Sequence, residues 1–312
     1  MKLYAAPMEG ITNWVYRRLR EKYFPGADKV FAPFISPTPD RRLTPRELDA
    51  LAPAHNEGVP LVPQLLVNAA EPFLWAAEEL AAMGYGEINL NLGCPSRTVT
   101  AKGKGAGALD DPTKLDRLLD GIFSAVKVPV SVKTRMGIAH YEEFAELAAV
   151  YAKYPVAELT VHARLLEDQY RLPAAPEELA RYTERITAPL CYNGDVFSSA
   201  DLARIGALLS SAEAVMLGRG LIADPGLIER LRGGTPRQES YTAFHDELME
   251  SYRSLGWSER AILCHMKELW VYMGPRYRDG EKCLKRIKKA QRLSEYAEAA
   301  GELFRHPMVE EG

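Results

Sequence analysis

Short apolar runs alternate with longer, helix-like stretches eight times between residues 3 and 231. Within the longer stretches, apolar residues recur at the spacing that places them on one helix face. Eight repeats of strand and helix favour a closed (β/α)8 barrel, a TIM barrel of the α/β class, over the competing doubly wound open sheet. The predicted strands are Leu3–Met8, Val30–Ile35, Leu61–Val67, Glu87–Leu92, Pro129–Thr134, Glu158–Ala163, Pro189–Asn193 and Ala214–Leu217.

The alternation stops after Gly233-Gly234, and only helix-like segments follow. These segments are Tyr241–Leu255, Glu259–Met273 and Glu281–Ala299, and glycines separate them. We therefore predict two domains, a (β/α)8 barrel in residues 1–235 and a small all-helical domain in residues 236–312.

The composition excludes several classes of protein. No segment approaches the roughly 20 consecutive apolar residues of a membrane span, and the first residues lack the zones of a signal peptide. The four cysteines are scattered without a CxxC pair, which argues against a disulfide framework or a zinc site and favours a cytoplasmic setting. With a net charge of −3, any contact with nucleic acid must come from a local basic patch.

Polar residues stand at the ends of most predicted strands, where barrels of this kind form their active sites. Buried polar groups cost about 1–3 kcal/mol each unless they are satisfied, so convergence on a polar ligand would explain them. These residues are Glu9, Gln64, Asn89, Asn91, Cys94, Lys133, Arg135, His162, Arg164, Asn193, Asp195 and Arg219, and Met8 precedes the first of them.

The ends of the last two predicted strands suggest a phosphate site. Gly194 and the turn Gly218-Arg219-Gly220 would let backbone N–H groups approach an anion, and Arg219 could add a bidentate clamp. Two ordinary glycine turns beside a surface arginine are the alternative.

Lys133 and His162 each stand directly after the apolar run of a predicted strand. Lys133 is predicted either to face an electron-rich cofactor or a developing oxyanion, or to extend from the barrel rim into solvent. His162 is either a ligand contact or a satisfied structural histidine. No HxH or HExxH pattern points to a metal.

Cys94 lies in a Gly93-Cys94-Pro95 turn after the fourth predicted strand. This turn would present a reactive thiol at the catalytic face, and an inert buried cysteine is the alternative. The segment Lys102–Ala108 that follows matches no phosphate-binding motif, and it predicts a mobile, cationic loop beside the site.

Together these segments resemble the tRNA-dihydrouridine synthases, FMN-dependent enzymes that reduce specific uridines in tRNA. They occur in family order from residue 5 to about residue 230, and the pairing of Asn-x-Gly-Cys-Pro-Ser with Lys-x-Arg-x-Gly is highly specific. The matching segments are Ala6–Thr12, Gln64, Asn89–Ser96, Val130–Gly137, Val161–Arg164, Asn193–Asp195 and Val215–Gly220.

The resemblance implies an FMN-binding catalytic barrel, a helical tRNA-binding domain, NADPH as reductant and a monomeric protein. It implies that Cys94 is the general acid, which gives a proton to C5 of uracil while hydride goes to C6, and that Asn91 and Arg135 contact the uracil. The implied FMN contacts are Pro7, Met8, Glu9, Gln64, Lys133, His162, Asn193, Gly194, Asp195, Gly218 and Arg219.

A basic segment near the C-terminus is the candidate surface for tRNA. Between Arg276 and Arg292 there are eight Lys and Arg residues against two acids. If Glu281–Ala299 is one helix, four of these cations share a face, and a solvated helix face is the alternative. The candidate tRNA contacts are Arg164, Tyr170, Lys267, Lys282, Lys285, Arg286 and Lys289.

Two segments depart from the family pattern, and both lie on the substrate side. The second strand ends in Ala32-Pro33-Phe34, where family members often have an acidic element, and the residues after Tyr170 lack the usual glycine and tryptophan. The sequence therefore does not indicate which uridine is the target. Another FMN barrel that reduces small molecules and a non-catalytic RNA-binding barrel are the competing interpretations.

Overall fold

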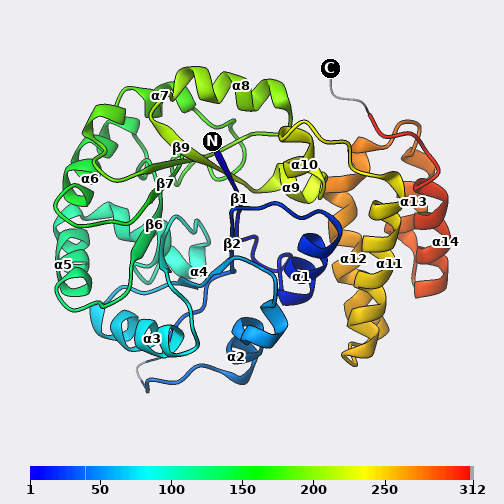
Figure 1. The fold of residues 1–312 in the computed structure, drawn as a ribbon, viewed down its shortest axis with the longest axis horizontal. Coiled ribbons are helices and arrows are strands. Elements are labelled where there is room, and N and C mark those ends of the chain that lie inside the picture. The colour runs from blue at the N-terminus through cyan, green and yellow to red at the C-terminus, as the bar shows by residue number, and fades with distance from the viewer. Residues whose placement is uncertain (39, 310–312) are drawn as a thin grey trace.

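The computed structural model describes residues 1–38 and 40–309, so residue 39 and the last three residues of the predicted helical domain lie outside the described part. Within it, nine strands pair in parallel in the order β3-β2-β1-β9-β8-β7-β6-β5-β4. Helices surround these strands, as Figure 1 shows. The predicted α/β TIM barrel is confirmed.

Each strand of the barrel falls within, or nearly within, one of the predicted runs, and at least one helix lies between consecutive runs. The strands are β1 (Lys2–Ala5), β2 (Lys29–Phe31), β3 (Leu61–Val62), β4 (Gln64–Leu65), β5 (Ile88–Leu92), β6 (Val130–Arg135), β7 (Leu159–His162), β8 (Leu190–Asn193) and β9 (Ala212–Leu217). The helices are α1 (Trp14–Tyr23), α2 (Pro45–Leu51), α3 (Ala70–Ala82), α4 (Arg97–Thr100), α5 (Pro112–Phe123), α6 (Phe144–Tyr151), α7 (Pro176–Ala180), α8 (Ser199–Leu208), α9 (Arg219–Ala223) and α10 (Leu227–Leu231).

The third predicted strand is split at Pro63 into β3 and β4. Proline has no N–H to donate to a neighbouring strand, so the ladder is interrupted there. β3 pairs with β2 and β4 pairs with β5, which joins the two ends of the sheet and nearly closes the barrel. The Pro63 carbonyl still accepts a hydrogen bond, from the Asn89 N–H at 2.9 Å.

The barrel is filled below the site by its own side chains. Residues on alternate positions of the strands point inward, and the remainder pack outward against the helices. The inward cluster consists of Tyr4, Ala6, Phe31, Val62, Cys191, Ala214 and Met216, each at most 7% exposed. A ligand can therefore enter only at the ends of the strands.

Four helices follow the barrel and lie together beside α1 (Figure 1). They are α11 (Gln238–Ser254), α12 (Glu259–Met273), α13 (Glu281–Lys289) and α14 (Leu293–Leu303). Because they share one hydrophobic cluster with Val15, Tyr16 and Leu19 of α1, the division into domains at residue 235 stays a prediction. None of the helices in the described part of the chain combines the length and apolar character needed to cross a membrane.

The prediction of one helix over Glu281–Ala299 is wrong. The backbone leaves the helical conformation at Ala290, where ψ is 135°, and Arg292 is extended with φ −123°. The Glu295 carboxylate accepts hydrogen bonds from the backbone N–H groups of Gln291 and Arg292, which starts a second helix with a capping interaction. Arg292 therefore does not continue the cationic face of α13.

Candidate active site

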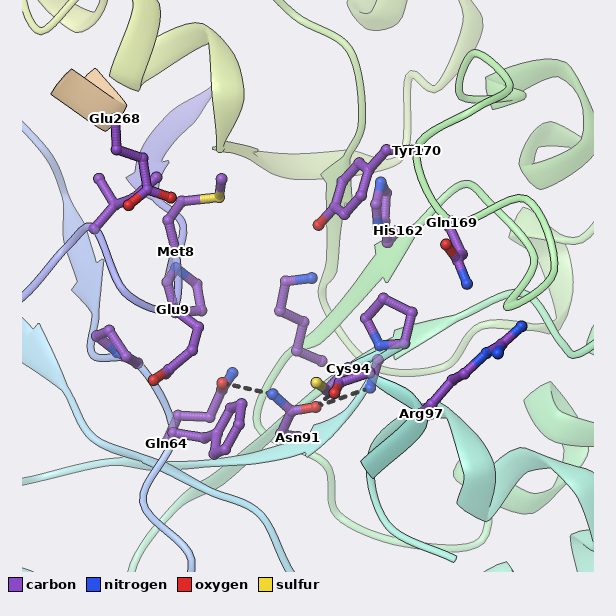
Figure 2. Close-up of a pocket in the computed structure, with 18 of the residues that line it drawn as sticks. Met8, Glu9, Gln64, Asn91, Cys94, Arg97, His162, Gln169, Tyr170 and Glu268 are labelled. Atoms are coloured by element: carbon purple, nitrogen blue, oxygen red, sulfur yellow. Dashed lines mark hydrogen bonds between the residues drawn. The ribbon is translucent and has the colours of Figure 1, made fainter. Parts of the chain in front are cut away.

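A pocket of about 620 Å³ opens at the carboxyl ends of the strands. Figure 2 shows Met8 and Glu9 on one side, His162 and Tyr170 on the opposite side, and Cys94 beside Asn91 between them. The structure thus brings together most of the side chains predicted from the strand ends. The other predicted residues in its lining are Pro7, Gln64 and Lys133, and the pocket also contacts Pro33, Phe34, Arg97, Gln169, Glu268 and Tyr272.

A ladder of side-chain amides forms the floor of the pocket. Asn91 Nδ2 donates to Gln64 Oε1 at 2.7 Å, and Gln64 Nε2 donates to Asn89 Oδ1 at 2.8 Å. Asn89 Nδ2 then donates to Ser131 Oγ at 2.8 Å. All four residues are at most 6% exposed, and their mutual bonds meet the requirement that buried polar groups be paired. The floor is therefore polar and fixed in orientation.

The turn that carries Cys94 is held from two sides. Asn91 Oδ1 accepts from the backbone N–H groups of Gly93 at 3.0 Å and of Cys94 at 2.9 Å. Arg135 Nε donates to the Gly93 carbonyl at 2.9 Å. Asn91 and Arg135, both predicted to contact uracil, thus also position the thiol.

Arg135 lies beneath the pocket and does not line it. Its guanidinium is completely buried and also donates to the carbonyls of Leu165, at 2.8 Å, and Gln169, at 3.3 Å. Burial, the largest cause, lowers the pKa of Arg135. These bonds join the turn after β5 to the loop after β7, so we expect Arg135 to act on substrate through Cys94 and Gln169.

Gly105 packs directly against the Cys94 turn and is not among the predicted site residues. A Cβ at this residue would lie 2.8 Å from the Cys94 carbonyl oxygen and 2.9 Å from Cys94 Cβ, both closer than packing allows. The predicted mobile loop instead contains a 3-10 helix, Gly105–Asp110, whose Ala106 N–H donates to the Cys94 carbonyl at 3.0 Å. The repeated glycines of this segment were the signal for such close packing.

The Cys94 thiol is kept protonated by its surroundings. Burial is the main cause of its raised pKa; the backbone N–H of Ser96 opposes the rise and the nearby Glu9 carboxylate adds to it. Arg135 and Lys133 lower the pKa less. A thiol with a pKa above its usual range is a poor nucleophile at neutral pH, but it is present in the form that donates a proton.

Lys133 and His162 also line the pocket. Burial, followed by the charge of Arg135, lowers the pKa of Lys133 to about 8. Burial, followed by Lys133, lowers the pKa of His162, and Arg164 Nη1 donates to His162 Nε2 at 2.8 Å, which leaves the ring neutral with its proton on Nδ1. Among the described residues, nothing accepts a hydrogen bond from the Lys133 ammonium. Lys133 is therefore available to a ligand.

A small cavity of about 40 Å³ continues the pocket toward the ends of β8 and β9. The Asp195 carboxylate binds Arg219 Nη2 at 2.5 Å and also pairs with Arg164. Asn193 Nδ2 donates to the Met216 carbonyl at 2.8 Å, so its amide supports the turn from within. An Asp–Arg network therefore occupies the strand ends that are predicted to bind phosphate.

Gly194 allows the backbone of this turn to approach the cavity. A Cβ there would lie 2.0 Å from the Tyr192 hydroxyl, so no larger residue fits without a shift. Gly218 lies opposite and places its backbone beside Met8. Both predicted glycine turns therefore expose backbone to the same small cavity.

Two of the candidate tRNA contacts lie near the pocket or in the core. Arg164 is only 1% exposed, and its guanidinium is used by His162, Leu172 and Asp195, so burial removes it from any surface that tRNA could reach. Tyr170 is 48% exposed, and its ring lies 4.9 Å from the Arg219 guanidinium.

The other candidates lie on the C-terminal helices. Lys267 is half-buried and donates to a backbone carbonyl at the end of α13. Lys282, Lys285 and Lys289 are exposed on α13, whereas Arg286 forms ion pairs with two glutamates of α14. The three lysines are therefore the freer cations of this face.

A family model described as "Dihydrouridine synthase" matches residues 4–299. The chain is 33% identical over 283 residues to a tRNA-dihydrouridine(16) synthase of Cupriavidus necator, covering 86% of this chain and 87% of that one. It is 34% identical over 248 residues to the protein of the same name from Ralstonia nicotianae, covering 77% and 75%. A tRNA-dihydrouridine synthase B of Pasteurella multocida is 27% identical over 274 residues, covering 88% and 79%.

Solved structures with the same fold include morphinone reductase, with a TM-score of 0.53 and 15% identity over 76% of this chain and 87% of that one. A histamine dehydrogenase from Rhizobium sp. 4-9 has a TM-score of 0.58 and 12% identity, covering 74% and 45%. At these identities the likeness concerns the barrel fold alone.

Proposed function

Because the chain belongs to the dihydrouridine synthase family, we propose that it reduces the C5=C6 bond of specific uridines in tRNA to dihydrouridine, with FMN as cofactor and NADPH as reductant. The observation that carries this proposal is the protonated Cys94 thiol, in one pocket with a Lys133 ammonium that has no acceptor among the described residues. A proton donor and a cation are the groups that a flavin-dependent reduction of a pyrimidine needs.

The main pocket fits the ring of FMN. Pro7, Met8, Lys133 and His162 line both this pocket and the small cavity, so a flat ring in the first can continue into an anionic tail in the second. We propose that Pro7 and Met8 line the ring, that Lys133 and Gln64 bind its polar edge, and that His162 lies alongside. When bound and reduced by NADPH, FMN supplies the hydride that is added to C6 of uracil.

The small cavity fits the phosphate end of FMN. Arg219 supplies a guanidinium, and Gly194 and Gly218 allow backbone N–H groups near an anion. Asp195 is already paired with Arg219, so we propose that it orients this guanidinium, while Asn193 supports the turn beneath it.

Cys94 is the proposed proton donor to C5 of uracil. Its thiol is protonated at neutral pH, and its turn is fixed by Asn91 and Arg135. Holding the acid in place before the substrate arrives lowers the entropic barrier of the transfer. Uracil must leave its stack to reach this pocket, as for other enzymes that act on a base within nucleic acid.

The exposed lysines of α13 are the proposed contacts with the tRNA backbone. Phosphate contacts by Lys282, Lys285 and Lys289 predict binding that weakens steeply with salt. Two of the relatives are named for position 16 of tRNA, and we propose this position as the target.

Deletion of the gene tests the proposed function in the cell. We expect dihydrouridine to disappear at position 16 of tRNA and to remain at positions modified by other enzymes. The measurement is a map of dihydrouridine across the tRNA pool before and after deletion. An unchanged map, in a host without a redundant enzyme, would contradict the proposal.

The affinity for FMN should depend on pH through Lys133. Its pKa is about 8 in the unliganded protein, and binding of an electron-rich ring edge favours the charged form and raises that pKa. Binding then takes up a proton above about pH 8, so affinity falls as pH rises from about 7 to about 9, by at most about tenfold per unit. Fluorescence titration of FMN measures this dependence. The Lys133→Met variant should bind more weakly and show a flat profile, and a flat profile in the wild type would contradict the assignment.

A further inference from the structure

A second pocket, also of about 620 Å³, lies directly beside the active site. The two pockets share Glu9, Pro33 and Phe34, so the end of β2 and the turn after β1 form the wall between them. The far side of the second pocket is lined by Trp14 and Trp257. It is therefore continuous with the catalytic pocket and belongs to both the barrel and the C-terminal helices.

Two tryptophan rings in this second pocket are held rigidly. Trp257 stacks on Tyr252 with ring centroids 4.4 Å apart, and it remains 37% exposed. Trp14 stacks on His55 at 4.1 Å, and its Nε1 donates to Asp49 Oδ2 at 3.0 Å. Each ring is thus anchored through one face. Stacking a base on an anchored ring requires little further ordering of the protein.

Exposed cations lie along the same path. Arg46 lines the second pocket and forms no hydrogen bond or ion pair with any described residue. A third cavity, of about 520 Å³, shares Trp14 and Leu255 with the second. It is lined by Arg18, which is exposed and forms no close ion pair within the described chain, although its charge acts on Glu247 of the same cavity. One exposed arginine thus lies in each of two adjoining pockets. Two separated arginines can contact successive phosphates of a single strand, whereas a small metabolite with one charge would use only one of them.

We propose that the second pocket binds the base of a nucleotide adjacent to the target uridine, stacked on Trp257, while Arg46 contacts the phosphate between the two nucleotides. This inference rests on the proposed function, because it requires the target uracil in the first pocket. The sugar-phosphate backbone of the RNA then continues past Trp14 toward Arg18. Stacking tolerates any base, so the pocket orients the strand without reading its sequence.

Abasic substitution of the RNA tests this inference together with variants at Trp257. The substrates are an unmodified tRNA transcript and two transcripts with an abasic nucleotide on the 5′ or the 3′ side of the target. In one of these two, we expect kcat/KM for uridine reduction to fall about tenfold with the wild-type enzyme. Trp257→Leu, which keeps an apolar side chain without a ring, should lose a similar factor on intact tRNA and nothing further on that abasic transcript. Trp257→Phe, which keeps a ring, should be close to the wild type.

The outcomes separate this inference from the proposed function. If the wild-type enzyme forms no dihydrouridine in intact tRNA, the proposed function fails. If it does, and both abasic transcripts react like the intact one, the second pocket holds no base. The inference is also overturned if Trp257→Leu lowers kcat/KM by the same factor on both abasic transcripts as on intact tRNA, because the tryptophan would then act independently of either base. Reduction of FMN by NADPH must be unchanged in Trp257→Leu, because a loss there would mean that the pocket binds the dinucleotide instead. The comparison of transcripts with the wild-type enzyme remains decisive even if Trp257→Leu does not fold.

Discussion

Cys94→Ala is expected to bind FMN and accept electrons from NADPH like the wild type, but to reduce uridine about 10²- to 10⁴-fold more slowly. The thiol lines the catalytic pocket, and burial keeps it in the protonated form. Removing it takes away the acid for C5 without changing the residues proposed to hold the flavin. Stopped-flow absorbance would follow the two half-reactions separately, first with NADPH and then with tRNA.

An exposed cysteine offers the matched control for this experiment. Cys264 lies on α12, is exposed and does not line the catalytic pocket, so Cys264→Ala removes a thiol outside the proposed chemistry. It should leave both half-reactions unchanged. Equal rates of uridine reduction in Cys94→Ala and the wild type would remove Cys94 from the role of proton donor.

Gly105→Ala is expected to slow uridine reduction about 100-fold while flavin binding is kept. The new Cβ would come within 2.9 Å of both the Cys94 carbonyl oxygen and Cys94 Cβ, so the turn must move away. A displacement of roughly 1 Å in a catalytic group can lower the rate by about two orders of magnitude. The measurement is the single-turnover rate of uridine reduction, with flavin content determined on the same sample.

Gly103→Ala separates this displacement from backbone strain. Gly103 and Gly105 have φ values of 61° and 56°, so alanine costs about 1–2 kcal/mol of stability at either position. A Cβ at Gly103 would meet no atom within 4 Å. Gly103→Ala should therefore lose only this strain energy in thermal unfolding and keep its rate of uridine reduction. Equal rates in the two variants would show that Gly105 does not position Cys94.

The strand ends could be predicted from the sequence because parallel strands deliver their last residues to one edge. For that reason the prediction placed Met8, Gln64, Cys94, Lys133 and His162 around one pocket, and the structure does bring them together. Periodicity alone located the strands well enough for this, even though proline divides one of them into two.

What the sequence could not reveal depends on contacts between distant segments. The bond from Arg135 to the Gly93 carbonyl joins residues 42 positions apart, and no local pattern distinguishes such a buried arginine from one that faces substrate. Arg164 followed the same rule of strand ends, yet its partners, Leu172 farther along its own loop and Asp195 after β8, draw it into the core. Helix α13 ends at Lys289, and Glu295 caps a new helix shortly after it. The spacing of Lys and Arg residues, from which one long helix was predicted, carries no information about this cap.

The proposed activity of this pocket is flavin-dependent reduction of uridine in tRNA. Its most direct test is to incubate the purified, FMN-loaded protein with NADPH and an unmodified tRNA transcript, and to quantify dihydrouridine by mass spectrometry against NADPH consumed. We expect dihydrouridine at position 16 in proportion to the NADPH oxidised under anaerobic conditions. Oxidation of NADPH with orotate or an enone as acceptor, and no dihydrouridine in tRNA, would contradict it.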